Sequence, residues 1–236
     1  MIDMHSHCLP LMDDGARTIQ ESLEMLLCAK NNGASLVAAT PHCITDSEEG
    51  VADFLERRDK ALDMLLKAMS DNDDNYPEIL PGAEVYLGCD VSEFSNLEKL
   101  CYKGTNYLLV EMPSRYETRK LSEWIYNISV KGIVPVIAHV DRYTRYKEFM
   151  TEFNVVENIV YQINGSAFLS LSGRMRINNI FRRHKNFIVS SDMHNCSSRP
   201  YNLMQVKPIV EKKYPDKTEM LLCGGAEKIL QNKIFS

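Results

Sequence analysis

Two histidines near the start of the chain are spaced to bind one metal ion. His5 and His7 follow a short apolar stretch, in the run DMHSH at residues 3–7. On a β-strand, residues i and i+2 point to the same side, so both imidazoles can face one point. A neutral imidazole is a common ligand of divalent metals. The pair therefore predicts a metal site at the end of the first strand.

Further candidate ligands stand at or near the ends of other short apolar runs. They are His42, Glu84, Glu111, His139, Asp192 and His194, and the loop after the first pair adds Asp13 and Asp14. A single histidine or carboxylate in such a place is usually a satisfied structural group. The joint pattern is different, because a charge within an apolar strand costs several kcal/mol unless it is paired or binds metal. The set therefore predicts a site for more than one metal ion, and only His184, in a basic run, is expected at the surface.

Strand-like and helix-like segments alternate along the chain and would position these residues. The expected strands are residues 2–5, 35–40, 78–86, 107–112, 133–139, 160–164 and 187–192. The expected helices are residues 18–32, 51–70, 91–100, 121–131, 146–154, 177–184, 201–213 and 218–231. Continuous apolar strands that alternate with helices indicate an α/β fold with a parallel sheet covered on both sides. About seven βα units favour a barrel, as one domain over residues 1–236, with the site at the carboxyl ends of its strands.

Composition and charge narrow the classes of function. The net charge is -5, whereas a protein that binds nucleic acid non-specifically needs a basic face. No apolar run of membrane-spanning length and no export signal are visible, so we expect a cytoplasmic protein without membrane insertion. The 7 cysteines are odd in number and form no C-x-x-C pair, and without an export signal we expect them to be reduced thiols. None has an arginine six residues downstream, which excludes the loop of the thiol-dependent phosphatases, and a P-loop is missing too.

Several short motifs together resemble one known superfamily. They are HSH at residues 5–7, DDG at 13–15, TPH at 40–42, GAE at 82–84, AHVDRY at 138–143 and SDMHN at 191–195, with RP at 199–200. These motifs resemble the polymerase-and-histidinol-phosphatase (PHP) superfamily. More narrowly, the opening H-S-H-x-L-P-x-x-D-D-G and the DMHN and RP ending are similar to its CpsB/YwqE branch. That branch consists of metal-dependent bacterial protein-tyrosine phosphatases from capsule and exopolysaccharide loci, and the resemblance extends over almost the whole chain.

The resemblance implies a fold, a metal content and a set of site residues. The fold would be a distorted (β/α)7 TIM-like barrel, and the site would hold three divalent metal ions, often manganese. The implied ligand sets are His5, His7, Glu84 and Asp192; Glu84, Glu111 and His139; and Asp14, His42 and His194. Asp13 competes with Asp14 for a place in the third set. Arg142 and Arg199 match two family arginines near the substrate phosphate, while Asp141 stands where the family more often has glutamate.

These expectations lead to the hypothesis of metal-assisted hydrolysis of a phosphate monoester. Imidazoles and carboxylates suit Mn²⁺, Fe²⁺ or Zn²⁺ and do not choose among them. Metals lower the pKa of a bound water, and the two arginines would neutralise charge on the phosphate oxygens. The resemblance implies a phosphotyrosine protein as substrate, namely the C-terminal tail of a membrane-associated bacterial tyrosine kinase that controls polysaccharide export. Tyr116, Tyr143 and Tyr146 are candidates to border a phosphotyrosine slot.

Three alternatives stay open on the sequence alone. The same metals would serve a histidinol-phosphate phosphatase or another small-molecule phosphoesterase of the superfamily. A non-catalytic binding module would predict missing ligands, whereas every implied ligand is present. Cys8, Cys43 and Cys196 stand beside predicted ligands and are candidates for a redox switch, although cysteine is usually a small buried apolar residue.

Overall fold

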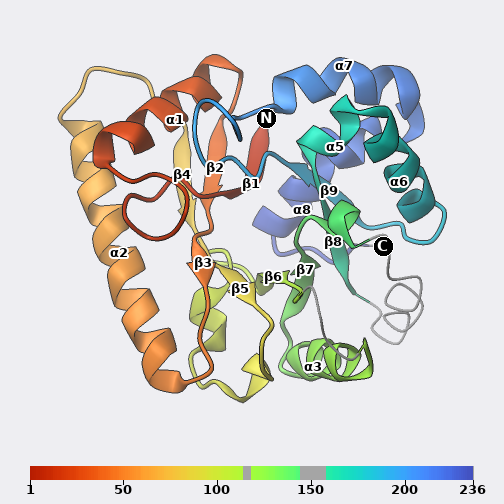
Figure 1. Cartoon of the computed structure of the whole chain (residues 1–236), viewed down its shortest axis with the longest axis horizontal. Coiled ribbons are helices and arrows are strands. Elements are labelled where there is room, and N and C mark those ends of the chain that lie inside the picture. The colour runs from red at the N-terminus through yellow and green to blue at the C-terminus, as the bar shows by residue number, and fades with distance from the viewer. Residues whose placement is uncertain (114–117, 144–157, 236) are drawn as a thin grey trace.

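The structure, a computed structural model, consists of parallel strands with helices packed around them (Figure 1), and it describes residues 1–113, 118–143 and 158–235. A three-stranded sheet has the order β1-β2-β4 and contains β1 (Ile2–Ser6), β2 (Leu36–Ala39) and β4 (Glu78–Pro81). A six-stranded sheet has the order β3-β5-β6-β7-β8-β9 and contains β3 (His42–Cys43), β5 (Glu84–Tyr86), β6 (Tyr107–Glu111), β7 (Val134–Ile137), β8 (Val160–Asn164) and β9 (Phe187–Ser190). Neighbouring strands in both sheets are parallel, which confirms the predicted α/β class.

Helices lie between many of the strands along the chain and cover the sheets (Figure 1). The helices are α1 (Ile19–Asn31), α2 (Glu48–Ser70), α3 (Thr118–Val130), α5 (Gly165–Leu169), α6 (Leu171–Phe181), α7 (Leu203–Lys213) and α8 (Gly225–Leu230). Short 3-10 turns occur at Val91–Glu93, Leu97–Leu100, Val140–Arg142 and Pro215–Lys217, and a π-helical turn occurs at Met220–Gly224. The predicted helix at residues 146–154 lies outside the described residues. In the described part of the chain, no helix is long and apolar enough to cross a membrane.

The two sheets meet at two short breaks. Two residues separate β2 from β3, and two separate β4 from β5, so that the predicted strand at residues 78–86 is two strands. Backbone hydrogen bonds cross the breaks: the Gly82 amide donates to Ala39 O (2.9 Å) and the Glu84 amide donates to Pro41 O (3.0 Å). The two sheets therefore lie end to end and are joined by these hydrogen bonds, but they remain separate sheets. Among the described residues they do not form one closed sheet, so the expected closed barrel is not confirmed.

The ends of β1 and β9 lie side by side. Ser6 forms a parallel bridge with Met193. The His7 amide donates to Met193 O (2.9 Å), and the Asp192 amide donates to His5 O (3.0 Å). These bonds join the first strand to the segment after the last strand, although the two are separated by most of the chain.

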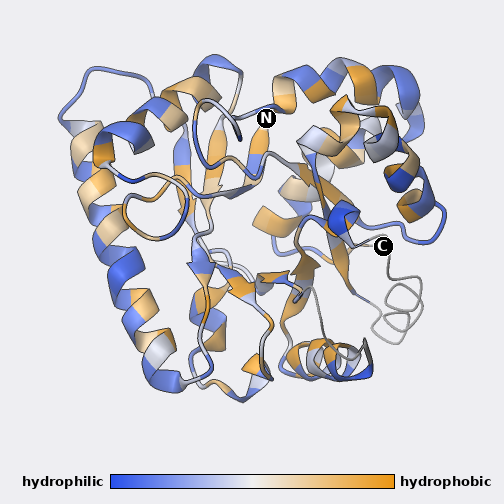
Figure 2. Ribbon diagram, in the orientation of Figure 1, coloured by the Kyte–Doolittle hydropathy of each residue, from blue (hydrophilic) through white to orange (hydrophobic). Residues whose placement is uncertain are grey.

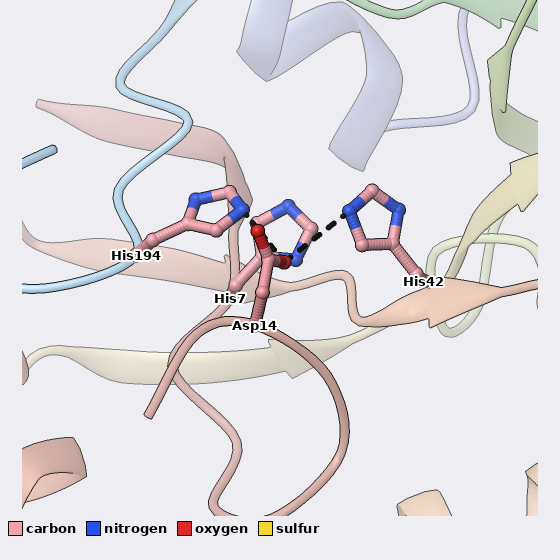
Figure 3. Close-up of side chains that lie close together, drawn as sticks. All are labelled: His7, Asp14, His42 and His194. Atoms are coloured by element: carbon pink, nitrogen blue, oxygen red, sulfur yellow. Dashed lines mark ion pairs between the residues drawn. The ribbon is translucent and has the colours of Figure 1, made fainter. Parts of the chain in front are cut away.

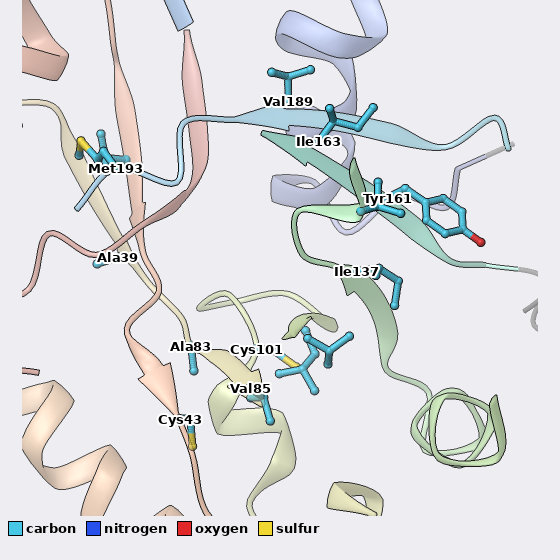
Figure 4. Close-up of a cluster of buried hydrophobic side chains, with 14 of the residues drawn as sticks. Ala39, Cys43, Ala83, Val85, Cys101, Ile137, Tyr161, Ile163, Val189 and Met193 are labelled. Atoms are coloured by element: carbon cyan, nitrogen blue, oxygen red, sulfur yellow. The ribbon is translucent and has the colours of Figure 1, made fainter. Parts of the chain in front are cut away.

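Alternate strand residues pack into two apolar clusters. The larger cluster joins strand residues such as Ile137 and Val189 to the buried faces of the helices (Figure 4). The smaller cluster contains the strand residues that alternate with these, such as Val136 and Ile188, and it includes Phe235 near the C-terminus. Because successive side chains of a strand point to opposite sides, the division shows that both faces of the strands are covered. Figure 2 accordingly shows hydrophobic strands among helices that carry hydrophilic residues on their outer sides.

The first helix begins and ends where local signals predict. Its N-cap, Thr18, accepts a hydrogen bond from the Glu21 amide through its side chain (3.1 Å). The Glu21 carboxylate accepts one from the Arg17 amide (2.7 Å), one residue before the position of a standard capping box. Gly33 then takes the left-handed conformation (φ 84°), which glycine adopts without strain, and leads the chain toward β2.

Two other helical segments differ from the prediction. Residues 91–100 form two 3-10 turns, because Asp90 caps the first turn and Phe94 then takes an extended conformation (φ -74°, ψ 131°). Helix α6 begins earlier than predicted, since the Ser170 side chain caps it by accepting a hydrogen bond from the Gly173 amide (3.0 Å). In both cases a polar side chain close to the helix end decides the boundary.

His184 is buried, so the prediction of a surface position is wrong. The residue is 8% exposed, and its ring centroid lies 4.1 Å from that of Tyr161. Burial, together with the charge of Arg183, lowers the pKa of His184 to about 4. The basic neighbours are exposed as their residue type suggests, but the chain after α6 turns the imidazole between them toward the sheet.

Candidate metal centre

The predicted ligands gather at the carboxyl ends of the strands. They come from β1, β3, β5 and β6 and from the segments after β1, β7 and β9, and they are His5, His7, Asp14, His42, Glu84, Glu111, His139, Asp192 and His194. Their side chains form one continuous cluster, in which neighbouring imidazole nitrogens and carboxylate oxygens lie 2.9 to 3.7 Å apart. The structure thus brings together residues from nearly the full length of the chain.

Glu84 lies at the centre of the cluster and is fully buried. Its Oε2 is 3.1 Å from His5 Nε2, 3.2 Å from His7 Nε2 and 3.1 Å from His42 Nδ1. Its Oε1 is 2.9 Å from His139 Nε2. One carboxylate therefore contacts imidazoles from several strands, a placement that suits a group bridging two metal ions.

Glu111 and His139 extend the cluster on one side. Glu111 Oε1 lies 3.5 Å from His139 Nε2, and its Oε2 lies 3.7 Å from His42 Nδ1. Burial, reinforced by the charge of Glu84, raises the pKa of Glu111 to about 7. A divalent cation in this position would reverse that effect, because it stabilises the ionised carboxylate. Glu111 and His139 therefore have the chemical groups and the spacing of a metal-ligand set that would share Glu84.

A second group of predicted ligands lies on the other side, formed by His7, Asp14, His42 and His194 (Figure 3). Asp14 lies between the two outer imidazoles (Figure 3), with its Oδ1 3.2 Å from His194 Nε2 and 3.6 Å from His42 Nε2. The Asp14 side chain is 64% exposed, whereas His194 is buried. The open side of the cluster is therefore at Asp14, where a ligand from solvent can enter.

Asp13 stands behind the cluster, on the far side of the His7 ring. Its Oδ2 is 2.7 Å from His7 Nδ1 and accepts a hydrogen bond from the His42 amide (2.9 Å), while its Oδ1 accepts one from the Gly15 amide (2.9 Å). Although burial favours the neutral acid, the hydrogen bond and charge of His7 hold the pKa of Asp13 well below its usual range. A carboxylate on Nδ1 leaves Nε2 for a metal. The geometry thus favours Asp14 rather than Asp13 as a ligand.

Two arginines converge on Asp192. Its Oδ2 accepts hydrogen bonds from Nη2 of Arg142 and from Nη2 of Arg199 (2.9 Å), and its Oδ1 lies 3.5 Å from Nε2 of both His5 and His7. Although burial opposes ionisation, the histidines and Arg142 hold the pKa of Asp192 well below its usual range. The two arginine side chains are 44% and 36% exposed. They therefore border the cluster and can reach an anionic ligand.

Two predicted ligands have left-handed backbone conformations. His139 has φ 31° and Asp192 has φ 54°, a region that residues other than glycine enter at a cost in free energy. The Asp192 amide donates to His5 O (3.0 Å), and Asn164 Nδ2 donates to Asp192 Oδ2 (2.8 Å). Hydrogen bonds therefore fix both the backbone and the side chain of Asp192. Strain maintained by surrounding bonds at a ligand position is typical of functional sites.

Gln162 is a supporting residue that sequence reasoning missed. Its Oε1 lies 3.1 Å from His5 Nδ1 and accepts a hydrogen bond from the His139 amide, and its Nε2 donates to Asn164 Oδ1 (2.9 Å). Gln162 therefore orients residues of two predicted ligand sets. The available signal was a pair of amide side chains two apart in the apolar strand β8, which must share one face. Asp141 accepts a hydrogen bond from the Asn164 amide (2.9 Å).

Asp3 ties β1 to the segment after β9. Its carboxylate accepts hydrogen bonds from the amide (2.9 Å) and the hydroxyl of Ser191. The same hydroxyl accepts one from the Met193 amide (3.1 Å). Burial raises the pKa of Asp3 to about 6 despite these bonds. Asp3 thus positions the segment that carries Asp192 relative to His5.

Several buried atoms of the cluster make no hydrogen bond among the described residues, although each lies close to a neighbouring imidazole or carboxylate. They include Glu84 Oε2, His42 Nδ1 and His194 Nε2. Such atoms cost free energy unless they bind something. A proton on His5 would offset part of this cost. The charges of Glu84 and Asp192 outweigh the opposite effect of burial and raise the pKa of His5 above its ordinary value. Convergent nitrogen and oxygen donors of this kind fit divalent transition-metal ions.

Tyr143 does not border an open slot, contrary to its suggested role. It is 7% exposed, its hydroxyl oxygen accepts a hydrogen bond from the Met112 amide (3.2 Å), and its ring centroid lies 5.6 Å from that of His139. Tyr143 therefore packs against a predicted ligand from behind. The other two candidates, Tyr116 and Tyr146, lie outside the described residues.

The cysteines beside the site have the properties of unreactive thiols. Burial raises the pKa of Cys8 to about 11 and that of Cys43 to about 12. Cys196 is exposed, and partial burial with the nearby Cys28 raises its pKa as well. A thiol that stays protonated reacts slowly with oxidants. These pKa values do not favour a redox switch.

The family of the chain follows from a comparison over nearly its whole length. Residues 1–231 match the family model for capsular polysaccharide synthesis proteins of the CpsB/CapC type. The chain belongs to the CpsB/CapC family. The resemblance inferred from the histidine and aspartate motifs is therefore confirmed. All the predicted ligands and both arginines fall within the residues that match the CpsB/CapC family.

Relatives in several bacteria are named tyrosine-protein phosphatases. YwqE of Bacillus subtilis (strain 168) is 29% identical over 244 residues, which cover 99% of this chain and 92% of the relative. CpsB of Streptococcus pneumoniae is 28% identical over 254 residues, which cover 100% of both chains. The putative tyrosine-protein phosphatase CapC of Staphylococcus aureus is 26% identical over 249 residues, covering 100% of this chain and 93% of the relative.

A solved structure supports the same relationship. The chain matches one from the crystal structures of YwqE from Bacillus subtilis and CpsB from Streptococcus pneumoniae with a TM-score of 0.80 and 26% identity. The match covers 99% of this chain and 95% of the other. Those two proteins are described as metal-dependent tyrosine phosphatases. The parallel α/β architecture of this CpsB/CapC protein is therefore that of phosphatases that need metal.

Proposed function

We propose that this member of the CpsB/CapC family is a metal-dependent protein-tyrosine phosphatase. The observation that carries the proposal is the position of Glu84 among four imidazoles, with Arg142 and Arg199 beside it on Asp192. Hydrolysis of a phosphate ester needs sites for divalent cations, which Glu84 and the imidazoles would provide. It also needs hydrogen-bond donors to the phosphate oxygens, which the two arginines would provide. The names of the full-length relatives support phosphotyrosine as the substrate.

We further propose three divalent metal ions, with manganese as the first choice and iron or zinc as alternatives. The proposed ligand sets are His5, His7, Glu84 and Asp192; Glu84, Glu111 and His139; and Asp14, His42 and His194. The shared contacts of Glu84 and the buried nitrogen and oxygen atoms without a hydrogen bond support these sets. Ions bound there would act as Lewis acids and provide a nucleophile for hydrolysis at neutral pH.

The protein's own groups would bind and orient the ester. Arg142 and Arg199 would exchange their shared contact with Asp192 for phosphate oxygens, since both side chains are partly exposed. The oxygen of water would attack phosphorus while the bond between phosphorus and the phenolic oxygen breaks. The proton that this water loses to solvent is balanced by the one that the departing phenolate takes up to become the tyrosine hydroxyl. Phenolate is a good leaving group, so a tyrosyl ester needs less acid assistance than an alkyl ester. Hydrolysis is direct, without a covalent enzyme intermediate.

The proposal also covers the partner and the setting. The substrate would be the phosphotyrosine-bearing C-terminal tail of a membrane-associated bacterial tyrosine kinase, and the reaction would take place in the cytoplasm. The family's place in capsular polysaccharide synthesis supports this choice. We infer a distorted seven-unit barrel as one domain over residues 1–236. The bridge between Ser6 and Met193 and the backbone bonds across the two sheet breaks support this arrangement.

A direct test compares a tyrosine-phosphorylated peptide with histidinol phosphate, each with Mn²⁺ and then with a chelator. Metal-dependent turnover of the peptide alone would support the proposal. Preference for histidinol phosphate would overturn the phosphotyrosine assignment in favour of a small-molecule phosphatase. Failure of the metal-loaded protein to turn over either substrate would favour the non-catalytic module.

A further inference from the structure

A groove opens beside the metal cluster, along the first turns of α2. Its volume is about 530 Å³. Outside the cluster, its walls include Met12, Ile44, Thr45, Gly50, Phe54 and Arg57. A Cβ atom at Gly50 would lie 1.8 Å from Thr45 Oγ1, so the segment before α2 rests directly on the helix. Close packing between two elements therefore shapes the groove.

The groove and the metal cluster are continuous. Asp14 and His42 line both of them, and Asp13 lines the groove while contacting His7. Asp14 lies between His42 and His194 (Figure 3), and the groove begins on this side of the cluster. A phosphate bound at the cluster would therefore lie at one end of the groove. A polypeptide attached to that phosphate through a tyrosine can extend along it.

The part of the groove beyond the cluster combines apolar side chains with one ion pair. Ile44 is 70% exposed, Phe54 is buried, and Met12 is partly buried against the core. Arg57 Nη1 lies 3.6 Å from Asp53 Oδ2, and its Nη2 donates to Met12 O (3.3 Å). The charges of Arg57 and Asp53 offset each other. An exposed isoleucine beside a buried aromatic ring gains free energy when a partner's apolar group covers it.

We propose that this groove binds the polypeptide that flanks the phosphotyrosine, and that Ile44 and Met12 select an apolar residue there. The inference rests on the proposed phosphatase activity and adds a specificity site to it. A small aryl phosphate fills only the cluster end, whereas a phosphorylated polypeptide contacts the cluster and the groove together. Recognition of the protein substrate is thereby separated from the chemistry at the metals.

The test compares three substrates with Mn²⁺-loaded enzyme: p-nitrophenyl phosphate and two phosphotyrosyl peptides. The peptides differ only in whether leucine or aspartate flanks the phosphotyrosine. Ile44→Asp places a charge in the groove, and Leu171→Asp is the matched control, since Leu171 is 76% exposed on α6 and does not line the groove. In Ile44→Asp, kcat/KM for the leucine peptide relative to p-nitrophenyl phosphate should fall about tenfold, chiefly through KM, while the control keeps the wild-type ratio.

A second variant keeps the test independent of folding defects. Ile44→Ser removes the apolar contact without adding charge and should lower the same ratio, and thermal melting reports whether each variant is folded. An unchanged ratio in both Ile44 variants, or a wild type that does not prefer the leucine peptide, would overturn the groove proposal and leave the phosphatase function intact. If the wild type hydrolyses p-nitrophenyl phosphate but neither peptide, the phosphotyrosine function itself fails, and the groove proposal fails with it.

Discussion

His7 Nδ1 and Asp13 Oδ2 lie 2.7 Å apart, and this contact decides which way the histidine ring faces. The Nε2 atom of the same ring is 3.2 Å from Glu84 Oε2. A carboxylate on one ring nitrogen fixes the tautomer and makes the other nitrogen a better metal ligand. The adjacent Asp14 faces His194 directly. Two neighbouring aspartates therefore have different positions, one behind a predicted ligand and one among the predicted ligands.

The first prediction separates these two aspartates. Asp13→Asn should lower Mn²⁺ affinity about 10- to 100-fold, because it removes the charge that orients His7, yet full metal content should return at high Mn²⁺. Asp14→Asn should instead lose a metal equivalent that added Mn²⁺ does not restore. Metal content after Mn²⁺ titration checks both outcomes. Identical behaviour of the two variants would contradict the assignment.

The second prediction concerns the central carboxylate. Glu84→Gln should reduce kcat/KM for p-nitrophenyl phosphate at least about a hundredfold and lower the bound metal content, because a neutral amide does not bridge two cations. Glu98→Gln makes the same change at an exposed position and should behave as the wild type. Steady-state kinetics and metal analysis on both variants provide the measurement. A Glu84→Gln protein with full metal content would argue against a bridging role.

The third prediction concerns the two arginines that share Asp192. Arg142→Lys and Arg199→Lys should each lower kcat about 10- to 100-fold with unchanged metal content, because lysine lacks the planar fork that binds two phosphate oxygens. Arg183→Lys, at an exposed position after α6, is the control. The measurement is kcat alongside metal content. Loss of metal before loss of kcat would show that these arginines hold Asp192 rather than the substrate phosphate.

The fourth prediction is a pH dependence of stability that arises outside the metal site. The pKa of His184 is lowered from an ordinary 6.5 to about 4 in the folded protein, so the unfolded chain binds a proton more readily. The stability that depends on neutral His184 is complete above its ordinary pKa and is lost as the pH falls toward the folded value. His184→Phe retains an aromatic ring against Tyr161 and should lose less Tm than the wild type between about pH 7 and about pH 5.

Melting curves of both proteins with chelator present provide this measurement, because bound metals would add a pH dependence of their own. An equal fall of Tm in the two proteins would mean that His184 does not titrate with a lowered pKa. A wild type that gained stability on acidification relative to His184→Phe would reverse the sign of the argument.

Much of the candidate site was predictable because its signals are local. His5 and His7 stand two apart at the end of an apolar strand, and parallel strands place their carboxyl ends at one edge. Thr18 and Gly33 mark the ends of α1, because capping involves only the nearest backbone groups. The elements and the chemical groups at their ends follow from neighbours a few positions away, without knowledge of the packing.

Only the tertiary structure decided how distant groups meet. The choice between Asp13 and Asp14 depends on where their loop meets His7 and His42, and the role of Gln162 depends on the approach of β8 to β1. The burial of His184 likewise depends on contacts beyond its sequence neighbours. The sequence determined which elements form and which groups they carry, because hydrophobic periodicity and capping act over a few residues. The tertiary structure decided which atoms face one another, because burial and hydrogen bonding there are shared between segments far apart in the chain.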